Sequence, residues 1–166
     1  MYIFQVNQIH IILVFVFYVK GIIINSMLTV IVYQSLLGAS KKYAYWLANN
    51  LDCPIYTFKN IPEKKLRQCD IVIVISGTYF GIMPLVQYIK RNWGILQSKK
   101  VIALAVGIIS PTRPQSIQAY EKIPIFIRKK IKYFKLPGKI LGISPLGEVS
   151  KIQLKPVLRQ IKTGWS

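Results

Sequence analysis

The chain has few side chains suited to acid–base or metal chemistry. Its 166 residues include five acidic side chains, one histidine (His10) and two cysteines, Cys53 and Cys69. This composition argues against carboxylate cages for magnesium or calcium, paired-carboxylate hydrolysis, histidine triads and a disulfide framework. We therefore assign no catalytic side chain and no metal site, and we expect a bound cofactor to carry any redox chemistry. The cysteines are expected to be free thiols, as in a reducing compartment.

Positive charge is what the chain has in excess. Its 23 Lys and Arg residues give a net charge of +18, and the second half carries most of it. The densest part is the basic stripe, formed by Arg128, Lys129, Lys130, Lys132, Lys135 and Lys139. Arg128, Lys129, Lys130 and Lys132 predict contact with an anionic membrane surface rather than with nucleic acid. The alternative is a solvated face without a partner.

Residues 1–26 form an apolar segment with an unbroken apolar run from Ile11 to Val19. One interpretation is a membrane anchor, since a spanning helix requires about 20 mostly apolar residues. The basic residues that follow would then place residues 27–166 in the cytoplasm, at the inner face of the membrane. The other interpretation is a misassigned start, with Met27 opening the domain. The segment has no basic region before the run and no small-residue cleavage site, which argues against a cleaved signal peptide.

Residues 27–166 alternate between strand and helix patterns. Three runs, Leu28–Tyr33, Asp70–Ser76 and Val101–Val106, are mostly apolar without alternation, as in parallel strands buried on both faces. Weaker strands are predicted at 54–58 and 132–136. The predicted helices are 40–51, capped by Ser40; 61–67; 84–93; 114–130, interrupted by Pro124; and 149–162, kinked or delayed by Pro156. This order predicts an α/β domain with a doubly wound, five-stranded parallel sheet.

The loop after the first predicted strand has the form of a phosphate site. In a doubly wound sheet, ligands bind beyond the carboxyl ends of the strands. This loop leads directly into a helix and consists of Ser35, Leu36, Leu37, Gly38, Ala39 and Ser40. Its glycine allows tight curvature, and the helix start presents unpaired amide groups to an anion. The alternative is a helix that Ser40 merely caps.

Two further loops are expected at the same edge of the sheet. One consists of Gly77, Thr78, Tyr79, Phe80 and Gly81, and the other begins at Gly107. Two glycines around two aromatic residues suit a sharp turn that exposes a flat ring for stacking on a planar heterocycle. The alternative is a packed turn. The first loop lacks the lysine of a Walker motif and the three glycines of a dinucleotide fingerprint, so neither motif is present.

These segments resemble the flavodoxin-like superfamily, and within it the flavodoxin-domain proteins of the menaquinone-dependent protoporphyrinogen oxidase type. The resemblance covers about Leu28 to Ile140 and rests on residues 31–38, 42–44, 46–48, 77–81 and 133–139. It implies a sheet in the order 2-1-3-4-5 and a non-covalently bound FMN. The phosphate would lie at residues 35–40 and the ring among residues 77–81 and Gly107, packed by Tyr79 and Phe80. Leu37 and Ala39 replace polar side chains usual in the family, so backbone amides together with Ser35 and Ser40 are expected to hold the phosphate.

The resemblance implies an FMN-dependent redox protein of an oxidase-like type. It would pass electrons from a reduced substrate, such as a porphyrinogen, to a quinone or a protein partner. The excess of positive charge predicts that an anionic reduced flavin is favoured. Two alternatives stay open: an FMN electron carrier without a substrate of its own, and a flavin-free basic module that binds a membrane or nucleic acid through the basic stripe.

Overall fold

Five parallel strands form the central sheet of the computed structural model, which describes residues 27–139 and 146–163. The strands are β1 (Thr29–Gln34), β2 (Ile55–Thr57), β3 (Ile71–Gly77), β4 (Lys100–Gly107) and β5 (Ile131–Pro137). Their order is β2-β1-β3-β4-β5, and every neighbouring pair is parallel. The structure therefore confirms the predicted doubly wound sheet and its order. The predicted apolar segment 1–26 lies outside the described residues.

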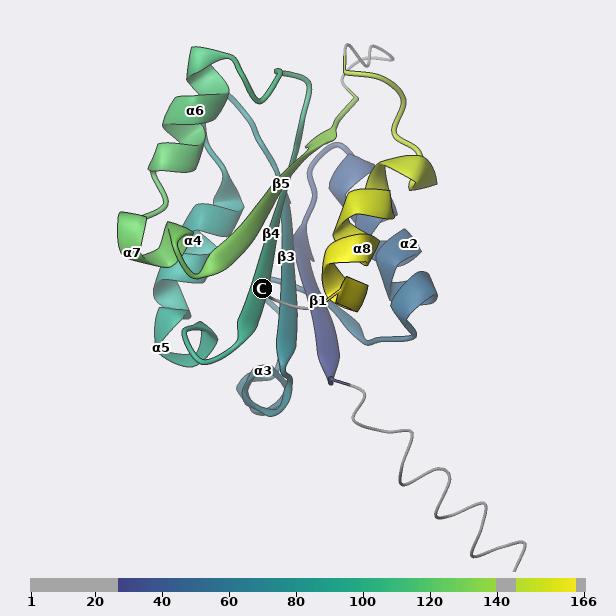
Figure 1. Cartoon of the computed structure of the whole chain (residues 1–166), viewed down its shortest axis with the longest axis vertical. Helices are drawn as coiled ribbons and strands as arrows, with labels where there is room; N and C mark the ends of the chain where they lie inside the picture. The colour runs from purple at the N-terminus through teal and green to yellow at the C-terminus, as the bar shows by residue number, and fades with distance from the viewer. Residues whose placement is uncertain (1–26, 140–145, 164–166) are drawn as a thin grey trace, which may run out of the picture.

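Helices cover both faces of the sheet (Figure 1). They are α2 (Ala39–Leu51), α3 (Glu63–Gln68), α4 (Pro84–Arg91), α5 (Trp93–Leu96), α6 (Pro114–Glu121), α7 (Ile125–Arg128), the 3-10 helix η1 (Lys151–Leu154) and α8 (Lys155–Thr163). In Figure 1, α2 and α8 lie on one side of the sheet and α4 to α7 on the other. Within the described residues, no helix is long and apolar enough to cross a membrane.

The two faces of β3 and its neighbours supply two separate cores. All seven residues of β3 are buried, with Val72 and Val74 in the core under α4 and Ile73 and Ile75 in the core under α2 and α8. This arrangement explains why the strand is apolar without alternation, because each face meets a layer of helices. The central strands thus form a rigid base from which the loops at their carboxyl ends project.

The structure confirms the predicted interruption at Pro124 and the predicted delay of the last helix by Pro156, and it divides one predicted helix further. The predicted helix 84–93 divides at Asn92 into α4 and α5, and Pro124 separates α6 from α7. The last helix begins at Lys155, with Pro156 in its first turn, after the 3-10 turn η1. Since proline lacks an amide hydrogen, it is tolerated at a helix start but not within a helix.

Both cysteines are free thiols, as expected. Cys53 is half-buried before β2, and Cys69 is buried before β3. Burial raises the pKa of the Cys53 thiol to about 11, so this thiol stays protonated at neutral pH and is a poor nucleophile.

Candidate functional site

Three loops meet at the carboxyl edge of the sheet, at the upper end of Figure 1. The amide of Leu36, after β1, donates to the hydroxyl of Tyr79, after β3, at 3.1 Å. The amide of Thr78 donates to the carbonyl of Val106 in β4 at 2.7 Å, which ties the second loop to the third. The structure therefore brings together the three loops that the sequence pattern predicted to meet.

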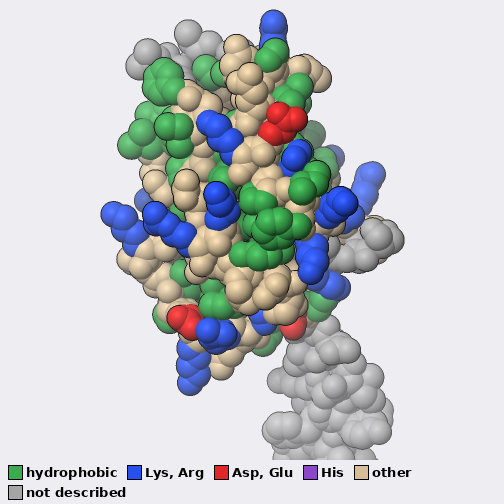
Figure 2. Space-filling model, turned by 90° about the vertical axis from the view of Figure 1, so that its left-hand side faces the viewer, with side chains coloured by type: hydrophobic (Ala, Val, Ile, Leu, Met, Phe, Trp, Pro, Cys, Tyr) green, Lys and Arg blue, Asp and Glu red, His purple; other side chains and the backbone are tan. Residues whose placement is uncertain are grey.

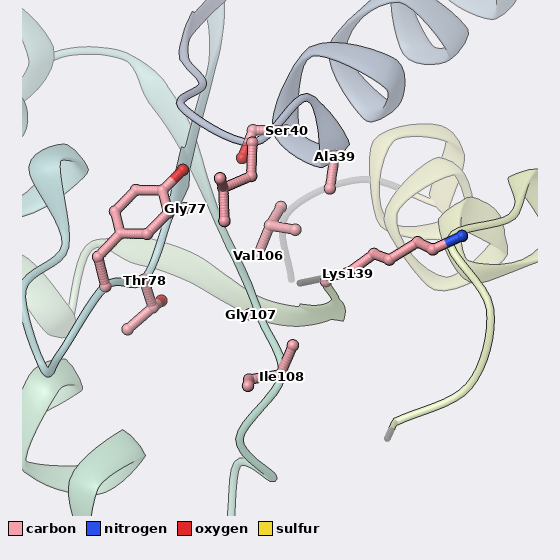
Figure 3. A pocket seen from close by; sticks show the side chains of 11 residues that line it. Ala39, Ser40, Gly77, Thr78, Val106, Gly107, Ile108 and Lys139 are labelled. Atoms are coloured by element: carbon pink, nitrogen blue, oxygen red, sulfur yellow. The ribbon is translucent and has the colours of Figure 1, made fainter. Parts of the chain in front are cut away.

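A small hollow lies between these loops and the start of α2 (Figure 3). Its cavity volume is about 20 Å³, which is room for a single water-sized group. The residues that line it are Leu37, Ala39, Ser40, Gly77, Thr78, Tyr79, Val106, Gly107, Ile108, Gly138 and Lys139. Lys139 lies at the rim and extends towards α8, away from Gly77 and Thr78 (Figure 3).

Gly38, not Ser40, ends the loop and caps α2. Gly38 has a φ of +87°, in the left-handed region that glycine adopts readily, and its amide donates to Ser35 Oγ at 3.1 Å. The predicted cap at Ser40 is wrong, because Ser40 is already within the helix and is only 2% exposed. Its side chain lines the hollow beside Ala39 (Figure 3). In the sequence, Gly38 rather than Ser40 marked the start of this helix.

The start of α2 has unpaired backbone donors beside the hollow. In the described part of the chain, the amides of Leu37, Ala39 and Ser40 have no hydrogen-bond acceptor, and all three residues line the hollow. Such amide groups carry the positive end of the helix dipole. A small anion at the mouth of the hollow would therefore be bound by backbone groups, even though Leu37 and Ala39 lack polar side chains.

The loop after β3 forms a tight turn in which one aromatic side chain is exposed and the other packs against the backbone. Tyr79 and Ile82 exchange two backbone hydrogen bonds of 2.9 and 2.8 Å across Phe80 and Gly81. Both central residues have positive φ, 47° and 76°, as a type I′ turn requires. Phe80 is fully exposed at the tip. Tyr79 lies against Gly77, where a Cβ atom would overlap its ring.

Lys135 also lies at this edge of the sheet. The sequence pattern had placed this residue in the basic stripe. It donates from Nζ to Thr78 Oγ1 at 3.0 Å, and burial lowers its pKa to about 8. The period-two alternation of β5 was the available signal, because it puts Lys135 on the same face as Tyr133, opposite to Lys132 and Phe134. The basic stripe is therefore not one continuous surface.

The start of the basic stripe lies at the other end of β5. Arg128, Lys129 and Lys130 precede Ile131, the first residue of the strand, whereas the three loops follow the strand ends. Lys129 and Lys130 are exposed, but the Arg128 guanidinium lies 5.2 Å from the centre of the Tyr120 ring and is half-buried. Figure 2 shows Lys and Arg side chains spread over the side that carries α6 and α7.

The mouth of the hollow suits a small anion such as a phosphate group better than a flavin ring. A cavity of about 20 Å³ encloses neither a phosphate group nor a three-ring system. A phosphate would lie at the mouth of the hollow, beside the unpaired amides and the left-handed Gly38. The ring would therefore lie across the open rim, between the turn at Phe80 and the start of the loop at Gly107. Residues 35–40, 77–81 and 107 thus lie along one edge of the sheet.

Residues 30–162 match the flavodoxin domain family. The match covers most of the chain, so the protein belongs to that family. Members of this family are typically flavin-binding redox proteins. No curated protein matches the chain in sequence.

Similar solved structures include a flavodoxin from Archaea. It is 18% identical, with a TM-score of 0.48, and the alignment covers 65% of this chain and 81% of that one. The Trp repressor binding protein of Bacillus subtilis is 16% identical, with a TM-score of 0.47 and coverage of 69% and 90%. A flavodoxin of Streptococcus pneumoniae is 16% identical, with a TM-score of 0.43 and coverage of 63% and 78%.

Proposed function

We propose that this protein binds FMN and is an oxidoreductase of an oxidase-like type. It would accept electrons from a reduced organic substrate, such as a porphyrinogen, and pass them to a quinone or a protein partner. The unpaired amides of Leu37, Ala39 and Ser40 beside the loops after β3 and β4 carry the proposal. The bound flavin would supply the electron chemistry, which the side chains of this chain lack.

The proposed roles of the loops follow from the chemistry of their exposed groups. The amides at the start of α2 would bind the phosphate, with Ser35 holding the loop through its bond to Gly38. Phe80 is the aromatic side chain free to stack on the ring, since it is fully exposed next to the site. Tyr79 would contribute its ring at the boundary between phosphate and flavin, where its hydroxyl contacts Leu36.

Apolar side chains around the site favour an acceptor or donor with an apolar surface. Leu36, in the loop after β1, is 75% exposed, and Ile82, in the turn after β3, is 63% exposed. Leu37, which is also exposed, lines the hollow itself. Exposed apolar groups at a ligand-binding edge are common where a second molecule docks. This observation is compatible with a quinone and with a protein partner, and it also favours the second candidate, an electron carrier that docks on its partner. Turnover of a small-molecule substrate distinguishes the two.

The test is FMN binding to the purified protein and to an Ala39→Asp variant. We expect FMN absorbance bands to persist through desalting in the wild-type protein. A carboxylate at position 39 stabilises the helix start but repels the phosphate, so Ala39→Asp should reduce FMN affinity more than tenfold without loss of thermal stability. Fluorescence quenching of FMN measures the affinity.

The matched control adds the same charge at the other end of the same helix. Asn50 is exposed in the last turn of α2, so Asn50→Asp should leave FMN affinity within about twofold. The proposal is wrong if the wild-type protein binds no FMN, or if Ala39→Asp binds FMN as tightly as Asn50→Asp does.

A further inference from the structure

Lys135 is directed into the carboxyl edge of the sheet. Its ammonium donates to Thr78 Oγ1 at 3.0 Å, and Thr78 lines the hollow. A Cβ atom at Gly107 would lie only 2.9 Å from Lys135 Nζ, so the ammonium occupies the space beside Gly107 at the end of β4, where the third loop begins. Lys135 therefore connects β5 to both loops that would flank the flavin ring.

Within the described residues, this ammonium has no carboxylate partner. Among residues 27–139 and 146–163, the one ion pair joins Arg67 and Glu63, which are exposed and lie within α3. Lys135 is half-buried, and burial lowers its pKa to about 8. Holding a partly desolvated cation without a counter-charge costs free energy, so such groups are usually paired with an anion. An anionic ligand at this edge of the sheet would supply that charge.

We propose, on the basis of the proposed FMN binding, that Lys135 is the electrostatic partner of the reduced flavin ring. When oxidised FMN takes up two electrons and one proton, the ring gains one net negative charge. Lys135 would hold its positive charge next to that anion and so raise the reduction potential of the flavin. The electrons would come from an organic two-electron donor, and in the test they come from dithionite.

Neighbouring cations are less well placed for this role. Lys139 lies at the rim of the hollow but extends towards α8 (Figure 3). Lys122 donates to the carbonyl of Gly81 at 2.9 Å and is exposed at the outer side of the turn. Lys135 alone among these three contacts both Thr78 and the backbone of Gly107.

The experiment measures the two-electron reduction potential of the FMN complex for Lys135→Met and Lys135→Arg. We expect Lys135→Met to lower the preference for reduced over oxidised FMN at least tenfold, which is about 30 mV for a two-electron couple. Lys135→Arg keeps the charge and should stay within about threefold of the wild type. Lys130→Met removes an exposed charge at the other end of β5 and should also stay within threefold.

A second measurement follows the lysine itself. Acylation of Lys135, quantified by mass spectrometry of its peptide, should be slowed by FMN, and more so after reduction by dithionite. If Lys135→Met does not fold, Lys135→Gln takes its place. A protein that binds no FMN overturns the proposed function and this inference together. FMN binding with an unchanged potential in Lys135→Met, or with Lys135 unprotected, overturns this inference alone.

Discussion

At the scale of single residues, Phe80 combines a costly backbone conformation with a fully exposed side chain. Replacing it with Asn, which tolerates positive φ, should stabilise the fold by about 1 kcal/mol. The same change removes the ring that would stack on flavin, so FMN affinity should fall about two- to tenfold. Thermal unfolding and FMN titration measure the two effects. Phe80→Tyr keeps a ring, and it should show neither effect; a stability gain without loss of affinity would remove Phe80 from the site.

Lys135 makes stability depend on pH in a defined window. Its pKa is lowered from 10.5 to about 8 in the folded protein, so between these values the unfolded chain binds more protons and its contribution to stability rises with pH. Lys135→Met should therefore be more stable than the wild type at pH 7, and the difference should shrink as pH rises towards 10.5. Urea unfolding at several pH values measures this. A pH-independent difference would contradict the desolvated charge.

At the scale of elements, Gly138 allows the chain just after β5 to approach the end of β4 closely. A Cβ atom at Gly138 would lie 2.9 Å from the Gly107 Cα and 3.0 Å from its carbonyl carbon. Because backbone atoms cannot turn away as a side chain can, Gly138→Ala should destabilise the protein by about 1–3 kcal/mol in urea unfolding. Gly94, in α5, has open space at this position, so Gly94→Ala is the control. Equal stability of the two variants would contradict the close approach.

The elements themselves were largely predictable from local patterns. The central strands are buried on both faces, so their runs of apolar residues required no knowledge of the rest of the chain. The cap of α2 was missed because serine is a commoner N-cap residue than glycine, whereas here a left-handed Gly38 precedes the first helical residue. Contacts between distant loops were not predictable locally: Tyr79 lies 43 residues from Leu36 and Lys135 lies 57 residues from Thr78.

At the scale of the whole molecule, folding divides what looked like one basic stripe. Arg128, Lys129 and Lys130 lie at the amino end of β5, whereas Lys135 lies near its carboxyl end, by the proposed cofactor site. Contact of the former group with an anionic membrane stays a prediction, and it would leave the three loops free for FMN and a redox partner. Folding thus separates the predicted membrane contact from the proposed cofactor site.

The central claim is that backbone amides at the start of α2 bind the phosphate of FMN. Amide NMR spectra of the ¹⁵N-labelled protein, titrated with FMN and with riboflavin, test it most directly because riboflavin differs in lacking the phosphate. We predict large shifts of the Leu37, Ala39 and Ser40 resonances with FMN and small ones with riboflavin. Equal shifts with both ligands, or FMN-induced shifts confined to other parts of the protein, would contradict the account.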